Sequence, residues 1–498
     1  MNLYDALNNF MASLANALWG TPLVLLLLGG GFYFSIISRL TPFRYLKHAV
    51  DILLGKYDSE DDPGQITHFQ ALSSALSSTV GMGNIAGVAI AIHTGGPGAI
   101  FWMWCTAILG MTTKFFTCTL SIMYRGKDDQ GEIQGGVMYY IEEGLGKKYR
   151  PLAIMFGLSG MIGCTIFFQA NQLSQIIREY FYNSTGLFQS NILFGDLFTG
   201  ILVASLVSVV IFGGFKRIAK VASKMVPLMV GLYLVAAVIV IVKNIQVVPS
   251  VFLLIISDAF SGNAVAGGAI GTMISIGVRR GLFSNEAGSG TETMAHGAAK
   301  TNEPVSEGLV AILEPFIDTI IICTITGLVL LSSGVWNEKH ENTFAQADLI
   351  FLDKVYTEDK EEDVKDLFNY LNGNSGISMY SGKIDVIDGR HSNEISILHA
   401  RSLAEDILFY NNDEEVFNGT LNVVDGKLQN DLIVKGKSLV HSAPLTAIAF
   451  DRGFFGNYGN YIVSIGLLLF AFSTAISWSY YGDRAMTFLF GAGSVVYY

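Results

Sequence analysis

The stretch Thr79-Val80-Gly81-Met82-Gly83-Asn84 lies in the middle of an otherwise apolar segment that runs from about His68 to Ile92. The segment is long enough to cross a lipid bilayer. Hydrocarbon offers no water to free backbone groups, so two glycines and an asparagine at this depth predict a helix that is interrupted inside the membrane. We expect the freed backbone of Gly81, Gly83 and Asn84 to face a ligand.

The composition is that of an all-α polytopic membrane protein. Hydrophobic residues make up 51% of the 498 residues and charged residues only 15%, against about 25% in a soluble domain. Runs of about 20 apolar residues, enough to cross ~30 Å of hydrocarbon, mark the candidate spans. These spans lie near residues 12–38, 68–93, 98–123, 151–181, 190–213, 221–242, 264–296, 308–334 and 458–482. A tenth begins near Arg484 and is cut off at Tyr498, so we expect a C-terminally incomplete chain.

Lysine and arginine are concentrated in alternate connections, which predicts the orientation. The basic connections are 39–67, 125–150, 213–224 and 279–300. The other short loops, 94–97, 182–189 and 243–250, contain only Lys243. By the positive-inside rule the basic set is cytoplasmic, and the N-terminus lies outside the cell membrane. Asp5 and the lack of Lys or Arg ahead of the first span argue against a cleaved signal peptide.

From about Val335 to Ser442 the chain turns polar and holds close to half of its 42 acidic residues. We therefore divide it into a membrane core of helices one to eight (1–334), an acidic extracytoplasmic insert (335–442) and a continued core with helix nine and the start of helix ten (443–498). The net charge of −11 belongs largely to the insert and does not indicate nucleic acid binding. All four cysteines fall inside predicted spans, so we expect no disulfide and no metal cofactor.

Two stretches of the insert, 382–390 and 419–427, resemble each other. Each alternates apolar residues and ends in Asp-Gly followed by a basic residue, which predicts a strand and a tight turn. Apolar positions at helical spacing predict a helix from Ser396 to Phe409. We expect a small α+β module. Because the similar stretches are short, both a true repeat and a chance match stay open.

A second glycine-rich segment, Gly262 to Gly277, precedes the motif Arg279-Arg280-Gly281-Leu282-Phe283-Ser284-Asn285-Glu286-Ala287-Gly288. Interruptions in two distant hydrophobic segments are typical of a binding site between two repeats of a transporter. The structural alternative is that small residues only allow helices to pack closely.

Polar residues inside other spans support a site. Gln169 lies in one span, and Ser473, Thr474 and Trp478 lie in another. Adjacent hydroxyls beside unwound backbone carbonyls offer the hard oxygen ligands that suit Na⁺. The alternative is that serine and threonine hydroxyls bond to the carbonyls of their own helix.

Ionisable residues at membrane depth are functional candidates, with pairing inside the bundle as the structural alternative. Glu314 and Asp318 lie four residues apart on one helix face, so we expect either pairing or a role in gating. Lys114 is expected to be a structural partner or to reach the interface by snorkelling.

Seven motifs outside the insert carry a family resemblance. They are His68-Phe69-Gln70-Ala71-Leu72, Gly81-Met82-Gly83-Asn84-Ile85-Ala86-Gly87-Val88, Gly95 to Trp104, Gly135 to Tyr140, Arg280 to Gly288, Asp318 to Val329, and Trp478 to Gly482. With them the chain resembles the alanine or glycine:cation symporter family, the sodium:alanine symporters of the amino acid–polyamine–organocation superfamily. The resemblance implies a leucine-transporter-like fold. Its two five-helix inverted repeats would be helices two to six and seven to eleven, after an extra N-terminal helix.

The resemblance also implies a substrate site between the two interruptions. Met82 and Gly83 would offer backbone amides to the substrate carboxylate, and backbone around Ile276 and Gly277 would bind its amine. The implied substrate-binding residues are Thr79, Met82, Gly83, Asn84, Gln169, Ile276, Gly277, Thr474 and Trp478. The implied sodium ligands are carbonyls near Ser77 and Val80 and the hydroxyls of Ser473 and Thr474.

Two features depart from the family. Met82 stands where members commonly have Thr, and the insert is longer than the usual loop. The insert is expected to be a lid, a partner-binding surface or a lineage-specific addition, three alternatives that the sequence leaves open.

The expected function is inward symport of a small neutral amino acid, alanine or glycine, with Na⁺, by a monomer without further cofactors. Half-helix dipoles would favour the carboxylate, and unwound carbonyls the cation and the amine. The nearest rival is a proton-coupled transporter of the same fold. A channel is disfavoured because no ring of identical filter loops is visible. A membrane enzyme would have to use Glu286, Glu292 and His296, without a nucleophile motif or phosphate loop.

Overall fold

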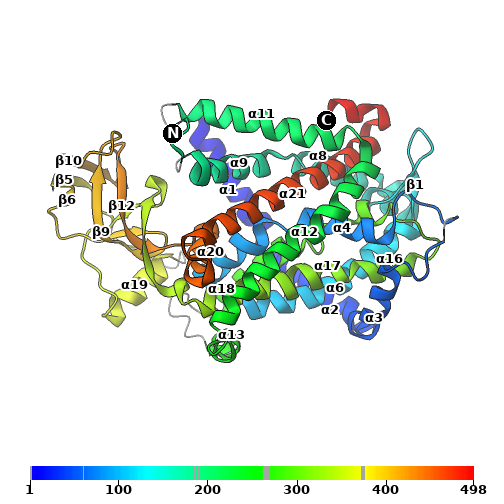
Figure 1. Cartoon of the computed structure of the whole chain (residues 1–498), viewed down its shortest axis with the longest axis horizontal. Helices are drawn as coiled ribbons and strands as arrows, with labels where there is room; N and C mark the ends of the chain where they lie inside the picture. Colours follow the sequence, from blue (N-terminus) through cyan, green and yellow to red (C-terminus); the bar gives the residue numbers. More distant parts are fainter. Residues whose placement is uncertain (1–2, 60, 183–184, 189–190, 262–269, 372–375) are drawn as a thin grey trace.

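The computed structural model describes residues 3–59, 61–182, 185–188, 191–261, 270–371 and 376–498. Most of the molecule is helical, and most long helices run roughly along its long axis, with the insert at one end (Figure 1). The helices of the first half are α1 (Leu3–Leu18), α2 (Thr21–Ile37), α3 (Thr41–Leu53), α4 (His68–Thr79), α5 (Val88–Gly95), α6 (Ala99–Met123), α7 (Val137–Tyr139), α8 (Arg150–Gly163), α9 (Phe167–Ile177), α11 (Ile192–Ile211) and α12 (Gly214–Lys243).

The second half of the core continues this helical arrangement. Its helices are α13 (Val248–Ser261), α14 (Ile270–Asn285), α15 (Glu292–His296), α16 (Pro304–Ala311), α17 (Leu313–Pro315), α18 (Thr324–Ser332), α20 (Ser442–Phe450) and α21 (Gly459–Phe490). Wide π-helical turns occur at Gly83–Gly87 (η1) and Phe316–Cys323 (η5). A short hairpin of β1 (Gly126–Lys127) and β2 (Ile133–Gln134) lies at the end of the molecule opposite the insert (Figure 1).

Five helices of the described residues are long and apolar enough to cross a membrane, or up to seven if each of two bent pairs is one span. The sequence predicted nine spans, and the difference arises where a predicted span is divided or, for 264–296, where it extends into residues that the structure does not describe. The predicted span 151–181 is divided into α8 and α9 around Cys164, and the first span, 12–38, is divided between α1 and α2 near Gly20. The inverted-repeat arrangement stays a prediction.

The predicted interruption of the first site helix is confirmed. α4 ends at Thr79, the next helical turn begins at Gly83, and the two parts are bent by 55°. Thr67 caps α4 in a reciprocal pair of hydrogen bonds with Gln70, which fixes where the helix begins.

The predicted unwinding at Ile276 and Gly277 is wrong, because α14 is a continuous helix through both residues. A Cβ on Gly277 would lie 2.5 Å from the carbonyl oxygen of Ala99 and 2.7 Å from Cβ of Trp102. This glycine therefore lets α14 approach α6, which is the small-residue packing alternative. Gly262, Gly267 and Gly268 lie outside the described residues.

Helical geometry ends in the second half of the motif Arg279 to Gly288. Three residues that follow α14 have positive φ angles: Glu286 (50°), Gly288 (94°) and Gly290 (81°). The break that follows α14 therefore lies about ten residues later than predicted.

The insert is an α+β module. Its elements are β3 (Lys339–Phe344), β4 (Ile350–Phe351), α19 (Glu361–Leu371), β5 (Gly382–Ile387), β6 (Arg390–His391), β7 (Ile397–His399), β8 (Ser402–Leu403), β9 (Glu405–Tyr410), β10 (Gly419–Val424), β11 (Lys427–Leu428) and β12 (Ile433–Leu439). The described strands form three antiparallel sheets, in the orders β11-β10-β5-β6, β3-β12-β9 and β4-β7-β8.

The predicted helix at Ser396–Phe409 is wrong. These residues form β7, β8 and β9, with positive φ at Ala400 and Arg401 between the first two strands. The apolar residues of this stretch are shared between two sheets, so burial in the sheets overrides the helical spacing. The described α-helix of the insert, α19, lies instead before β5, at Glu361–Leu371.

Both predicted strand-turn units are confirmed, and they pair with each other. β5 and β10 are antiparallel, with Ile384 opposite Leu421, the residue 37 positions later. The turn residues Asp388 and Asp425 are also 37 positions apart and share a φ of 48°. The two units have the same spacing and the same turn conformation, and the equivalent residues Ile384 and Leu421 pair with each other. A rotation that exchanges the two strands therefore returns this pair to itself, which favours a true repeat with a local two-fold axis.

Candidate substrate and cation site

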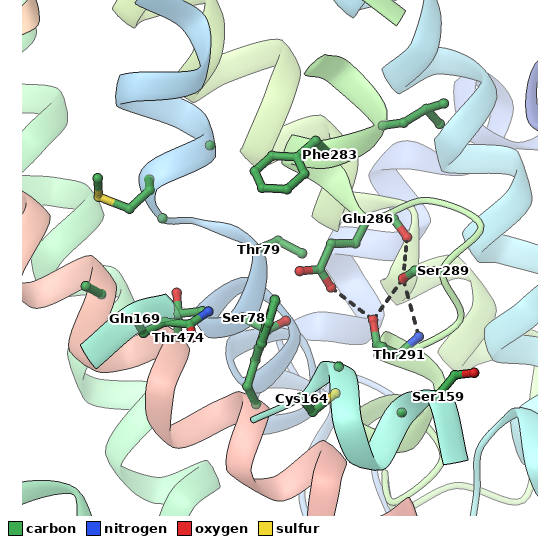
Figure 2. A pocket seen from close by; sticks show the side chains of 18 of the residues that line it. Ser78, Thr79, Ser159, Cys164, Gln169, Phe283, Glu286, Ser289, Thr291 and Thr474 are labelled. Carbon is green, nitrogen blue, oxygen red and sulfur yellow. Dashed lines mark hydrogen bonds between the residues drawn. The ribbon is translucent and has the colours of Figure 1, made fainter. Parts of the chain in front are cut away.

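A cavity of ≈350 Å³ lies beside the interruption of the first site helix (Figure 2). Its wall is built by the end of α4, the turn before η1, α8, α9, α14 and α21. Six predicted substrate-binding residues line it: Thr79, Met82, Gly83, Gln169, Thr474 and Trp478. The helix interruption therefore opens onto a space that residues far apart in the sequence share.

Three polar atoms at this cavity are buried and have no hydrogen-bond partner in the described part of the chain. They are Thr474 Oγ1, Gln169 Oε1 and Trp478 Nε1. Figure 2 shows Gln169 and Thr474 together on one side of the cavity. A buried polar atom without a partner is destabilising by roughly 1–3 kcal/mol, so such atoms are rare unless they serve a ligand or water.

Asn84 lies behind the interruption and does not line the cavity. Its Oδ1 accepts a hydrogen bond from the Gly81 N–H (2.8 Å), and its Nδ2 donates to Asp318 Oδ1 (2.6 Å) and Ser284 Oγ (3.1 Å). The side chain therefore satisfies a backbone group that the break sets free and ties it to η5. We assign Asn84 a bracing position, whereas the sequence predicted a place beside the substrate.

Ile276 and Gly277 are likewise absent from the cavity wall. Ile276 packs against Gly95, where a Cβ would lie 3.2 Å from Ile276 Cγ2. Both residues therefore face the packed interior around α5 and α6.

The four predicted sodium ligands lie where α4 meets α21. The Ser77 hydroxyl donates to the carbonyl of Ser473 (2.9 Å), and the Ser473 hydroxyl lies 3.3 Å from the carbonyl oxygen of Ser77. Val80 is fully buried at the end of α4, and a Cβ on Gly81 would lie 3.1 Å from Thr474 Oγ1. The Ser473 hydroxyl also donates to its own helix at Phe470 (2.9 Å), so the backbone-bonding alternative applies to Ser473.

Among the described residues no group of His, Cys, Asp or Glu side chains is placed to hold a metal ion. A cation between α4 and α21 would therefore depend on hydroxyl and carbonyl oxygens. Such a set of neutral oxygen ligands fits an alkali cation as cargo.

Glu286 is a cavity residue that the sequence analysis named only for the enzyme alternative and not for the substrate site. It lines the cavity, is partly buried, and its Oε2 accepts a hydrogen bond from Thr291 Oγ1 (2.9 Å). Figure 2 shows Glu286, Ser289 and Thr291 in one hydrogen-bonded group. The glycines around it signalled a loop, and the loop turns this carboxylate into the cavity.

The sequence analysis also did not identify α8 as part of the cavity wall. Phe156, Ser159, Gly160 and Gly163 line the cavity from this helix, and small residues at helical spacing gave no functional signal.

The residues of the enzyme alternative do not converge. Glu286 lies at the cavity, Glu292 accepts a hydrogen bond from Thr117 (3.0 Å), and Nδ1 of His296 lies 2.5 Å from Glu307. Each therefore has a separate partner.

Two of the ionisable residues that the sequence predicted at membrane depth, Lys114 and Glu314, form a buried ion pair. Lys114 Nζ lies 2.7 Å from Glu314 Oε2, and both side chains are fully buried. Asp318 accepts hydrogen bonds from Asn84, Ser284 (2.8 Å) and Thr319 (2.8 Å). Lys114 is therefore the structural partner that one of the alternatives predicted.

Comparison with known proteins identifies relatives along the whole chain. A model of the sodium:alanine symporter family matches residues 4–353 and 427–498. The chain is 34% identical to an uncharacterized transporter of Haemophilus influenzae, over 99% of this chain and 85% of that protein. It is 32% identical to the sodium/alanine symporter AgcS of Methanococcus maripaludis, over 100% of this chain and 85% of the relative.

A further relative is the putative sodium/proton-dependent alanine carrier protein YrbD of Bacillus subtilis. The identity is 40%, over 66% of this chain and 65% of the relative. The matched family consists of transporters and is not an enzyme family. Together with its apolar helices, this makes the chain an integral membrane protein. The chain belongs to the sodium:alanine symporter family.

Proposed function

We propose that the protein is a secondary symporter that carries a small neutral amino acid, alanine or glycine, into the cell together with Na⁺. The main support is the cavity beside the helix interruption, where three buried polar atoms have no partner in the described residues. Its volume of ≈350 Å³ is near the lower end of the ~300–1,000 Å³ range of ligand pockets, which suits a small substrate.

The substrate carboxylate would lie at Met82 and Gly83, where η1 begins. Backbone N–H groups at the start of a helical segment, together with its dipole, favour a negative charge. The substrate amine would face the acceptor Gln169 Oε1 and the carboxylate of Glu286, because Ile276 and Gly277 do not line the cavity. In this arrangement the negative end of the amino acid would meet backbone N–H donors, and its positive end would meet an acceptor oxygen and a carboxylate.

The co-transported Na⁺ would lie between α4 and α21. Carbonyl oxygens of Ser77 and Val80 and hydroxyl oxygens of Ser473 and Thr474 would bind it. Because α4 would contribute to both sites, a cation that holds α4 in the substrate-binding arrangement raises the affinity for the amino acid.

We further propose the leucine-transporter-like arrangement of two inverted repeats, with the N-terminus outside and the insert on the outer face. We also propose a monomer as the functional unit, because the described residues that line the cavity come from one chain.

Uptake of labelled alanine into proteoliposomes tests the proposal. With an inward Na⁺ gradient we expect rapid accumulation that stops when Na⁺ is replaced by choline. Equal rates with and without the gradient would refute sodium symport.

The rival is a proton-coupled transporter, which the name of the relative YrbD keeps open. Replacing Ser473 and Thr474 together by Ala should abolish Na⁺ dependence in a sodium symporter and leave a proton-driven one unchanged. Ser464→Ala is the matched control, because this hydroxyl on α21 donates to its own helix at Asn460 (2.7 Å) and does not line the cavity.

A further inference from the structure

Away from the cavity, the carboxylate of Glu307 on α16 lies between two imidazoles. His296 Nδ1 lies 2.5 Å from one carboxylate oxygen, and His68 Nδ1 bonds the other. The three side chains belong to α15, α16 and the first residue of α4, and they are 0%, 0% and 4% exposed. An ionised carboxylate only accepts hydrogen bonds, so both Nδ1 atoms must carry a proton.

This triad continues in both directions. On one side His68 Nε2 lies 3.7 Å from Asp58, whose side chain is 39% exposed. On the other side His296 Nε2 lies 3.9 Å from Glu314, the partner of Lys114. The ionisable side chains therefore form a continuous row from the surface to Lys114. Neighbouring charged atoms in this row are at most 3.9 Å apart.

The buried charges of this region do not balance unless histidines are protonated. The fully buried carboxylates of the described core are Glu292, Glu307, Glu314 and Asp318, and they face a single fully buried lysine, Lys114. An unpaired charge in a low-dielectric interior is strongly unfavourable. A proton on each imidazole reduces the excess negative charge and makes Glu307 the centre of an ion cluster.

Other groups face the triad from neighbouring elements. Asp58 faces His68, Cys118 and Arg125 face Glu307, and Glu314 faces His296. Lys114 and Glu292 lie one step further away, next to Glu314. Arg125 directs its guanidinium to backbone carbonyls of Gly297, Ala299 and Thr301, so it does not replace the histidines as a partner of Glu307.

We propose that His68, Glu307 and His296 form a proton-binding site, separate from the proposed sodium site, whose bound proton holds α4 against α15 and α16. The inference rests on the proposed function in one respect, namely that α4 moves during transport. When the proton leaves His68 towards Asp58 and solvent, the charged bridge to Glu307 becomes a weaker neutral hydrogen bond. The released α4 carries Ser77 and Thr79 with it, so acid conditions slow the transport cycle.

The pH dependence of alanine uptake tests the proposal, with the pH set equal on both sides of the vesicle membrane. Between about pH 8 and pH 6, where histidine titrates, we expect wild-type turnover to fall by at least about threefold. Glu307→Gln should flatten this profile to less than about half of that change, since the carboxylate that holds the proton is gone. Glu303→Gln is the matched control, because this exposed carboxylate lies one helical turn earlier.

A second variant covers the case that Glu307→Gln does not fold. His68→Gln keeps a side-chain N–H donor for Glu307 and removes the titrating imidazole, so it should also flatten the profile. Identical pH profiles in wild type and His68→Gln overturn the proposal.

Infrared difference spectra of the purified chain between the same two pH values separate this inference from the proposed function. We expect imidazole and carboxylate bands that disappear in Glu307→Gln and persist in Glu303→Gln. If these bands are found while Na⁺-driven uptake is absent, the proposed function fails and the proton site stands. If the bands are unchanged by Glu307→Gln, the proton site is refuted even where sodium symport is observed.

Discussion

Two polar regions of the membrane core differ in whether their side chains form ion pairs with one another. At the cavity, Thr474 Oγ1, Gln169 Oε1 and Trp478 Nε1 are buried without partners in the described chain. Around Glu307, by contrast, ionisable side chains contact one another in a chain from Asp58 to Lys114.

The difference separates binding from bracing. Polar atoms that are unpaired in the absence of ligand contribute little to the stability of the empty protein, so their removal should reduce transport and leave stability nearly unchanged. Charged side chains that pair with each other hold the bundle together, and removal of one leaves the other as a buried charge without its partner. The five predictions that follow test this distinction.

The largest effect is expected at the buried ion pair. Lys114→Met leaves Glu314 as an uncompensated charge and should lower the stability by about 3–5 kcal/mol. Unfolding in mixed detergent micelles measures it. The double variant Lys114→Met with Glu314→Leu should regain most of the loss, and equal stability of wild type and single variant would contradict the ion-pair assignment.

A smaller loss is expected at Asn84. Asn84→Leu keeps the size of the side chain but leaves the Gly81 N–H and the Asp318 carboxylate without this partner, at about 1–3 kcal/mol. The same unfolding assay checks the value. A variant that is as stable as wild type but has lost alanine affinity would return Asn84 to the substrate site.

At the cavity, a substitution should change transport more than it changes stability. Thr474→Val removes a hydroxyl without a partner, so stability should stay within about 0.5 kcal/mol of wild type. The half-saturating Na⁺ concentration should rise at least about tenfold, which corresponds to 1.4 kcal/mol. Destabilisation with unchanged Na⁺ dependence would show that Thr474 belongs with the bracing residues.

Met82 should affect selectivity alone. Met82→Thr enlarges the cavity, so uptake of glutamine relative to alanine should rise about threefold to tenfold. This change is smaller than the roughly 10–200-fold discrimination that one methylene group gives in a tightly packed pocket. Competition of unlabelled amino acids against labelled alanine measures this ratio. A constant ratio would place the Met82 side chain outside the substrate's reach.

The smallest effect concerns a buried histidine without a carboxylate partner. In the insert, His399 stacks on Phe344 (4.2 Å) and contacts Ser438 Oγ, and burial lowers its pKa to about 4. A lowered histidine pKa destabilises the folded insert as the pH falls below about 6.5, by about 1 kcal/mol at pH 6. Limited proteolysis of the full chain should show this acid sensitivity, and His399→Gln should reduce it.

The membrane class and the first helix break follow from local sequence. A run of about 20 apolar residues spans lipid as a helix that satisfies its own backbone, and the two glycines and the asparagine at 81–84 weaken the local preference for helix. The strand-turn units at 382–390 and 419–427 were predictable for the same reason, because Asp-Gly turns are local.

The errors share a cause. A second break was predicted because the segment is rich in glycine, and the family resemblance placed it at Ile276 and Gly277. Glycine also allows helices to pack closely, and contact with α6 decides between the two. The helical spacing at Ser396–Phe409 likewise yielded to burial in two sheets.

By itself, the sequence determined that this is a membrane protein with an interrupted helix, an acidic insert and a small set of polar residues at membrane depth. Only the tertiary structure decided which of those polar residues face a cavity and which face each other. The physical reason is that partner choice depends on distances between helices far apart in the chain. Asn84 meets Asp318, and Thr474 meets the broken end of α4, only after the bundle has packed.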